Sequence, residues 1–148
     1  RRQDLTVRSM AYWLFKSEPN TWSWDDQVKK GEKGEEWNGV RNHLAKNQMQ
    51  AMKVGDLGFF YHSVNEKQIV GIVKVVAEAH PDSTDGTGTW HCVDIAAVKP
   101  LKEPVTLETV KKTPELADMM LVKNSRLSVQ PVTDAEWERV CKMGGVTA

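Results

Sequence analysis

The middle of the chain contains apolar runs whose composition predicts strands rather than helices. Aromatic and β-branched residues dominate these runs, and proline, glycine or short polar stretches bound them, as is typical of strands and turns. Gly71 interrupts the longest β-branched run, which predicts a bulge or a close approach of another group to the backbone. The runs occupy residues 12–19, 57–63, 69–79, 89–100 and 126–132.

Four further segments carry helix-start signals. Ser23 and Thr133 are each followed by an acid three residues later, the pattern of a capping box. Asn42 and Thr106 are N-cap residue types standing before segments with helix-forming composition. The polar, glycine-bearing stretch 31–37 predicts a loop. The expected helices cover about residues 24–30, 42–52, 107–112 and 134–143.

The order of these elements bears on the fold class. Strands occupy the centre and short helices lie between and after them, without the regular β–α alternation of a parallel doubly wound sheet. We therefore expect an α+β protein, a mostly antiparallel β-barrel flanked by short helices. At 148 residues the chain has the length of one domain. We assign residues 10–148 to it and interpret residues 1–9, which precede Met10, as a cloning remnant or disordered leader.

Charge and cysteine content exclude several classes of protein. Acidic and basic side chains number 20 each, so a strongly basic coat for nucleic acid is absent and any such contact must be local. No apolar run is long enough to cross a bilayer. The two cysteines, Cys92 and Cys141, lie far apart and fit a reducing compartment. We expect an intracellular protein, cytoplasmic in a bacterium or nuclear in a eukaryote, that is monomeric and has no membrane partner.

Motifs for common catalytic sites are missing from the sequence. There is no G-x-S-x-G, H-E-x-x-H or P-loop, and no histidines stand at helix-ligand spacing. His62 next to Ser63 is a weak nucleophile–base pair with no evident acid. His91 and Cys92 are neighbours on a predicted strand and point to opposite faces. We assign no catalytic residue, metal ligand or cofactor.

The stretch WNGVRN, residues 37–42, is the most informative polar motif. A nucleobase has a flat π face and an edge of donors and acceptors. Trp37 can stack on such a face, Asn38 can bond its edge, and Arg41 can pair with a phosphate. Gly39 would allow close approach to the backbone. The alternative is structural: Trp37 fills the core and Asn42 only caps a helix. If Trp37 is a stacking platform, its replacement should hardly change the melting temperature.

Five separated motifs resemble the EVE domain family: YWLFKSEP, WNGVRN, GDLGFFYHS, IVGIVKVVAEAHPD and LSVQPV, in that order. The resemblance implies a PUA-like fold and a binding module for modified bases in nucleic acid, with modified cytosine in DNA favoured and a modified RNA base as the alternative. EVE domains are similar to YTH domains, whose Lys–Ser pair and first cage tryptophan resemble Lys16–Ser17 and Trp37. We expect an apolar wall from Met120 or Leu121, or from Val64.

The ligand-binding hypothesis rests on ten residues, which the motif, the resemblance and the local charge nominate together. They are Lys16, Ser17, Trp37, Asn38, Gly39, Arg41, Asn42, His62, Ser63 and Arg126. Two other functions stay open. One is an enzyme acting on a nucleotide or RNA through His62, and the other is a protein-interaction module in which Trp37 is buried.

Overall fold

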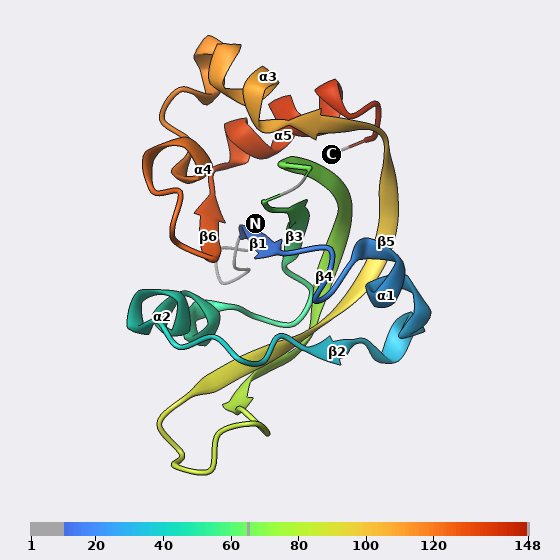
Figure 1. Cartoon of the computed structure of the whole chain (residues 1–148). Helices are drawn as coiled ribbons and strands as arrows, with labels where there is room; N and C mark the ends of the chain where they lie inside the picture. The colour runs from blue at the N-terminus through green and yellow to red at the C-terminus, as the bar shows by residue number, and fades with distance from the viewer. Residues whose placement is uncertain (1–10, 65, 148) are drawn as a thin grey trace, which may run out of the picture.

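A six-stranded mixed sheet organises the molecule (Figure 1). The computed structural model describes residues 11–64 and 66–147; the expected leader and Met10 lie outside this part. The strands are β1 (Tyr12–Ser17), β2 (Glu35–Glu36), β3 (Leu57–His62), β4 (Gln68–Pro81), β5 (His91–Thr106) and β6 (Val129–Val132). Their order across the sheet is β2-β5-β4-β3-β1-β6.

The pairing between strands confirms the α+β class. Neighbouring strands run antiparallel except β1 and β3, which are parallel. The long strands β4 and β5 have several register shifts, which bend and twist a sheet. Among the described residues the sheet is not closed into a barrel, because β2 and β6 remain its two edges. With only two residues, β2 is too short to form a ladder with β6, the strand at the other edge.

The helices are α1 (Trp24–Lys29), α2 (His43–Ala51), α3 (Leu107–Lys112), α4 (Met120–Lys123) and α5 (Asp134–Met143), with 3₁₀ turns at Gly31–Lys33 and Pro114–Leu116. All four expected N-caps are present, and Ser23 and Thr133 each complete a capping box. One expectation is wrong and one helix was not expected. Residues 35–36 pair with β5 instead of lying in a loop. The sequence did not predict α4, which has no side-chain cap.

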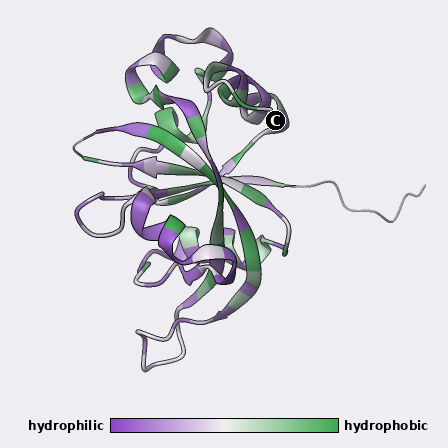
Figure 2. Ribbon diagram, turned by 90° about the vertical axis from the view of Figure 1, so that its right-hand side faces the viewer, coloured by the Kyte–Doolittle hydropathy of each residue, from purple (hydrophilic) through white to green (hydrophobic). Residues whose placement is uncertain are grey.

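Apolar side chains fill a core on each face of the sheet. Leu14 faces one core, whereas its neighbours Trp13 and Phe15 face the other, as strand alternation requires. The first core, which we call the α5 core, includes Phe59 and Trp137. The second, the α2 core, lies on the α2 side of the sheet. The strands accordingly contain runs of consecutive buried residues, as in β1 and β3, and Figure 2 shows apolar residues within the sheet.

The helix α1 is attached to the sheet at Gly71. A Cβ atom at Gly71 would lie 2.5 Å from the ring of Trp24, so only glycine admits this ring. The strand register also shifts between Ile69 and Gly71. Both the expected bulge and the expected close approach are therefore confirmed.

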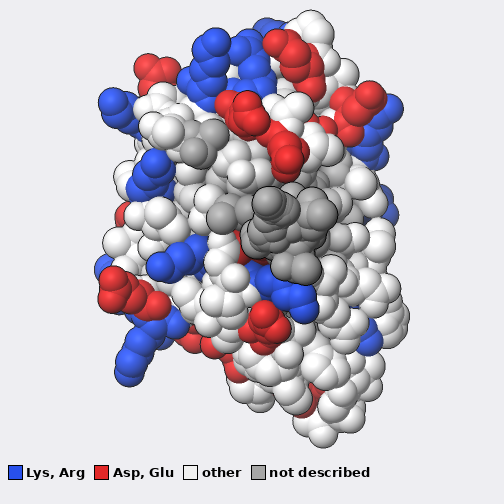
Figure 3. All heavy atoms as spheres, turned by 180° about the vertical axis from the view of Figure 1, so that it is seen from behind, with Lys and Arg blue, Asp and Glu red and all other residues white. Residues whose placement is uncertain are grey.

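The surface carries both charge signs in mixture. Figure 3 shows basic and acidic side chains interspersed on one face. Within the described part of the chain, no helix has the length and apolarity needed to cross a membrane. Cys92 and Cys141 are free and buried.

Candidate functional site

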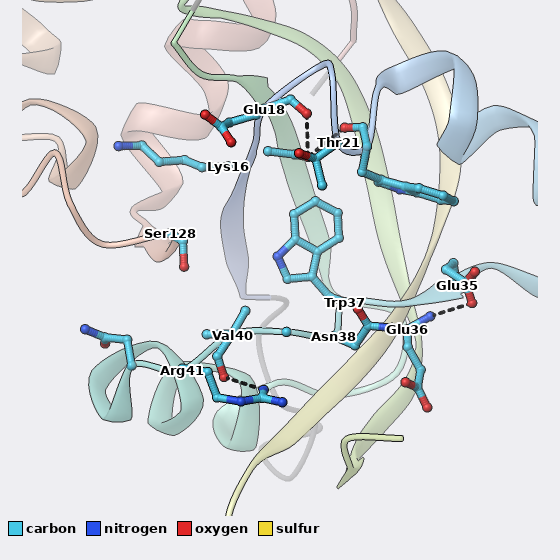
Figure 4. A pocket seen from close by; sticks show the side chains of 14 residues that line it. Lys16, Glu18, Thr21, Glu35, Glu36, Trp37, Asn38, Val40, Arg41 and Ser128 are labelled. Atoms are coloured by element: carbon cyan, nitrogen blue, oxygen red, sulfur yellow. Dashed lines mark hydrogen bonds between the residues drawn. The ribbon is translucent and has the colours of Figure 1, made fainter. Parts of the chain in front are cut away.

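A cavity of about 510 Å³ lies where the end of β1 meets the segment between β2 and α2. Seven of the ten nominated residues line it: Lys16, Ser17, Trp37, Asn38, Gly39, Arg41 and Asn42. The other lining residues are Glu18, Thr21, Trp22, Glu35, Glu36, Val40 and Ser128. The WNGVRN stretch thus forms a continuous wall, and the turn after β1 forms the facing wall (Figure 4).

Trp37 is at once a core residue and a cavity residue. Its backbone N–H donates to the carbonyl oxygen of Val93 at 2.8 Å, which ties the stretch to β5. The indole packs edge-on against Phe15 and Phe60, with ring centroids 5.4 and 5.7 Å away. Only 7% of Trp37 is exposed. In Figure 4 the ring projects into the cavity toward Thr21. The core position of Trp37 agrees with the structural interpretation, whereas stacking on a base stays a prediction that its place at the cavity border supports.

Asp82 holds the WNGVRN wall in place, although its sequence position suggested no role. Its carboxylate accepts the Gly39 N–H at 2.8 Å and pairs with the Arg41 guanidinium at 3.2 Å. Thr84 donates to the same carboxylate through its N–H and its hydroxyl, at 2.7 and 2.6 Å. Burial opposes ionisation of Asp82, but the bonds from Thr84, Gly39 and Arg41 outweigh it and lower its pKa.

The backbone at Gly39 explains why glycine occupies this position. Its φ is +81°, a conformation that other residues adopt only with strain. Next to it, Asn38 is exposed, and among the described residues its side-chain amide bonds to no protein group. Asn42 has a structural task, since its Oδ1 accepts the Ala45 N–H at 2.8 Å and caps α2. Asn38 is therefore the amide that is free to bond a ligand.

The facing wall begins with Lys16 and Ser17 at the end of β1. The Lys16 ammonium donates to the carbonyl oxygen of Ser125, and burial lowers the pKa of Lys16. The Ser17 hydroxyl donates to the carbonyl oxygen of Trp22 at 2.6 Å, so only its lone pairs remain for a ligand. Trp22 itself lines the cavity and donates from its indole to Gln27 at 3.0 Å.

Three nominated residues lie outside the cavity lining. His62 Nε2 accepts the Trp24 N–H at 3.0 Å, and Nδ1 contacts the Glu66 carboxylate at 2.5 Å, so both ring nitrogens are engaged in structure. Ser63 donates its N–H to Ser17 behind the wall. Arg126 is exposed on the loop after α4, two residues from Ser128.

None of the three candidates for the expected apolar wall, Val64, Met120 and Leu121, lines the cavity. Leu121 is buried in the α5 core, and Val64 is exposed in a turn away from the cavity. Met120 packs against the α2 core but does not line the cavity. The apolar surface comes instead from Trp37, Trp22 and Val40. Trp22 stands in a polar turn after a strand, and an indole there was the available signal for its role.

Known proteins are similar to this chain in sequence and in fold. An Agrobacterium tumefaciens protein of known structure is 58% identical, with a TM-score of 0.91 over 92% of this chain and 94% of its own. Chicken thymocyte nuclear protein 1 is 36% identical over 90% of this chain and 68% of its own length. Human thymocyte nuclear protein 1, solved in complex with DNA containing 5-methylcytosine, is 31% identical, with a TM-score of 0.85 over 93% of this chain and 99% of its own.

A more distant likeness extends to the YTH fold. A yeast YTH domain from Zygosaccharomyces rouxii, solved with N6-methyladenosine RNA, is 16% identical with a TM-score of 0.58, over 94% of this chain and 87% of its own. At this identity the likeness concerns the fold alone. The model of the EVE domain family matches residues 11–143 of this chain. The chain therefore belongs to the EVE domain family.

Proposed function

We propose that this protein is a non-enzymatic reader that captures one modified base of a nucleic acid in the Trp37 cavity. A modified cytosine in DNA is the favoured ligand, because the human relative was solved with DNA containing 5-methylcytosine. The observation that carries the proposal is the cavity itself. It joins a tryptophan ring, a free amide and a lysine in a space of about 510 Å³, large enough for a base.

Stacking on Trp37 requires a local movement. With 7% of the residue exposed, a base meets only the border of the indole in this conformation. Thr21, on the turn after β1, lies next to the outer edge of the ring in Figure 4. Moving this turn outward would open the ring face, and base–aromatic stacking is worth about 1–3 kcal/mol. The edge contacts with Phe15 and Phe60 leave the indole fixed from behind while the base enters in front.

Two free polar groups are suited to reading the base edge. Asn38 offers both a donor and an acceptor. Glu18 also lines the cavity, and among the described residues its carboxylate makes no hydrogen bond or ion pair. A carboxylate accepts from the exocyclic amino group of cytosine but has no such donor on thymine. The pair therefore favours cytosine over thymine, and the Asn38 donor can also bond the O2 carbonyl of cytosine, an acceptor that adenine lacks.

Flanking phosphates would contact the rim of the cavity. Arg126 is exposed and pairs with no acid in the described part of the chain, so its charge is available. Lys16 keeps two N–H donors beyond its bond to Ser125. The Arg41 guanidinium is already paired with Asp82, and we assign it a smaller share of phosphate binding than Lys16 and Arg126.

A binding array tests this function. Single- and double-stranded oligonucleotides of one sequence, in DNA and RNA, would carry cytosine, 5-methylcytosine, adenine or N6-methyladenine at one position. We expect duplex DNA with 5-methylcytosine to bind most tightly, by about tenfold or less over cytosine, since one buried methyl is worth about 1 kcal/mol. Flipping costs a few kcal/mol, so the absolute affinity should be modest. Equal binding of all oligonucleotides would refute a modified-base reader.

The two other functions gain less support from the residues. An enzyme using His62 would need a free ring nitrogen, and both are engaged. Incubation with the same oligonucleotides should leave them chemically unchanged, and any altered product would favour an enzyme. A protein-interaction module predicts that Trp37 fluorescence ignores bases. Quenching by the methylated duplex that is lost in Trp37→Phe would favour the reader.

We further propose that the reader acts as a monomer in a reducing compartment inside the cell. The free, buried thiols of Cys92 and Cys141 support such a compartment. The cavity is built from one chain, so base capture needs no second copy.

A further inference from the structure

A second cluster of chemically active side chains lies behind the cavity wall. It contains Glu36 on β2, His80 on β4 and Cys92 on β5, and one potential ligand atom from each lies within 4.8 Å of the others. His80 and Cys92 are directly paired across β4 and β5, and Glu36 is paired with Asp94 across β2 and β5. Such cross-strand partners project from the same face of a sheet.

Neighbouring polar groups hold the side chains of His80 and Glu36 in the cluster. The Nε2 atom of His80 lies 2.8 Å from the Asp94 carboxylate, which leaves Nδ1 on the side of Glu36. Ser83 donates its hydroxyl to one oxygen of Glu36 at 2.6 Å, and the other oxygen lies 4.0 Å from His80 Nδ1. A ligating histidine whose second nitrogen is held by a carboxylate is a recurrent feature of zinc sites.

We propose that Glu36, His80 and Cys92 bind a divalent cation of the zinc class. Thiolate, imidazole and carboxylate are the three ligand types that zinc accepts, and a fourth position would remain for water. Binding requires the Cys92 thiol to release its proton to solvent and the His80 ring to give up the Pro81 carbonyl, 3.0 Å from Nδ1. The mixture of a sulfur and a nitrogen donor disfavours calcium and magnesium, which take oxygen ligands.

The position of this site gives it a structural consequence. Glu36 also lines the cavity and directly precedes Trp37. Trp37 in turn bonds Val93, the neighbour of Cys92. A cation joining β2 to β4 and β5 would therefore stiffen the wall that carries Trp37.

Titration of the purified protein with Co²⁺ tests the site, because a cobalt–thiolate bond gives a near-ultraviolet charge-transfer band. We expect the band to saturate at one equivalent and to disappear when Zn²⁺ is added. It should be absent in Cys92→Ser and retained in Cys141→Ser, the matched control for a buried thiol in the α5 core. Asp94→Asn, which removes only the group that orients His80, should weaken Co²⁺ binding about 10–100-fold.

Circular dichroism establishes that each variant is folded before titration. If Cys92→Ser fails to fold, His80→Gln replaces it and should lose saturable Co²⁺ binding. A folded wild-type protein without the band would overturn the proposal. So would a band that survives Cys92→Ser or His80→Gln, or one lost in Cys141→Ser. None of these outcomes depends on nucleic-acid binding, so the site and the reader function are tested separately.

Discussion

Trp137 and Trp37 lie in the two cores of the same sheet, and they differ in what surrounds them. Trp137 is fully buried and stacked between Tyr12 and Phe59, with ring centroids 4.4 and 4.1 Å away. Among the described residues, the aromatic contacts of Trp37 are edge-on contacts with Phe15 and Phe60, and its ring borders a cavity. The two rings are thus almost equally buried, but the faces of the Trp137 ring are stacked against other rings, whereas those of the Trp37 ring are not.

That difference follows from the elements that cover each face. The α5 core is closed by α3, α4 and α5, whose apolar residues meet the sheet directly (Figure 1). The α2 core is covered in part by the WNGVRN stretch, which has polar side chains and is held by hydrogen bonds to Asp82 and Val93. A wall built on hydrogen bonds leaves space beside an aromatic ring, whereas a packed helix fills it.

The largest expected effect is on stability, from Trp137→Ala. Removing a ring stacked on both sides should lower the free energy of unfolding by about 3–5 kcal/mol, measured by denaturant titration. The affinity per folded molecule for a methylated duplex should stay unchanged, because Trp137 lies across the sheet from the cavity. A loss of affinity in the folded fraction would show that the two cores are coupled, and the comparison would fail.

Trp37→Ala should affect both quantities. We expect affinity to fall by about 1–3 kcal/mol through lost stacking. Stability should also fall, but less than in Trp137→Ala, because part of the ring borders a cavity rather than packed atoms. The burial of Trp37 thus revises the sequence-based expectation of an almost unchanged melting temperature. Trp37→Phe is the matched variant, and it should recover more stability than affinity. Unchanged affinity per folded Trp37→Ala molecule would remove Trp37 from the site.

Local signals made most of the fold predictable from sequence. The caps at Ser23, Asn42, Thr106 and Thr133 depend on residues within one helical turn, and all four are present. The strand β2 was missed, since its two residues pair with β5 only through contacts made about 60 positions along the chain. Closure of the sheet likewise depends on how much long strands bend, which residue patterns do not express.

The same distinction explains the site. The six residues of WNGVRN are consecutive and line the same wall of the cavity, so a local motif was enough to predict them together. Asp82 was missed because it meets Gly39 across 43 positions of sequence. His62 was nominated for its chemistry, but a backbone N–H from Trp24 engages it. The Glu36–His80–Cys92 cluster has no recognisable spacing, because strand pairing alone assembles it.

Asn38→Ala should have a smaller effect, on selectivity. If Asn38 reads the base edge, its loss leaves the cytosine-to-adenine preference weaker by about 1–2 kcal/mol. The preference for methylated over unmethylated cytosine should change less, because a methyl group is read by apolar contact. Titrations with four matched duplexes measure both ratios. Asn47→Ala, an exposed amide on α2 outside the cavity, is the control. An unchanged cytosine-to-adenine ratio would show that Asn38 is not an edge reader.

The smallest expected effect is on the salt dependence of binding, from a charge at the rim of the cavity. Each neutralised phosphate contributes about 0.9 to the slope of log affinity against log salt on duplex DNA. We expect a wild-type slope set by about two or three contacts, and Arg126→Ala should lower it by one contact. At moderate salt the affinity itself should change little, because an exposed charge is well screened.

Arg139 provides the matched control on the α5 side of the sheet. It lies on α5, where it pairs with Glu115 at 3.6 Å, and Arg139→Ala removes the same charge from the molecule. If the slope depends on net charge alone, both variants should lower it equally. If Arg126 contacts a phosphate beside the cavity, only Arg126→Ala should lower it. Equal slopes in the two variants would therefore show that Arg126 contacts no phosphate, and would contradict binding of nucleic acid at the rim of the cavity.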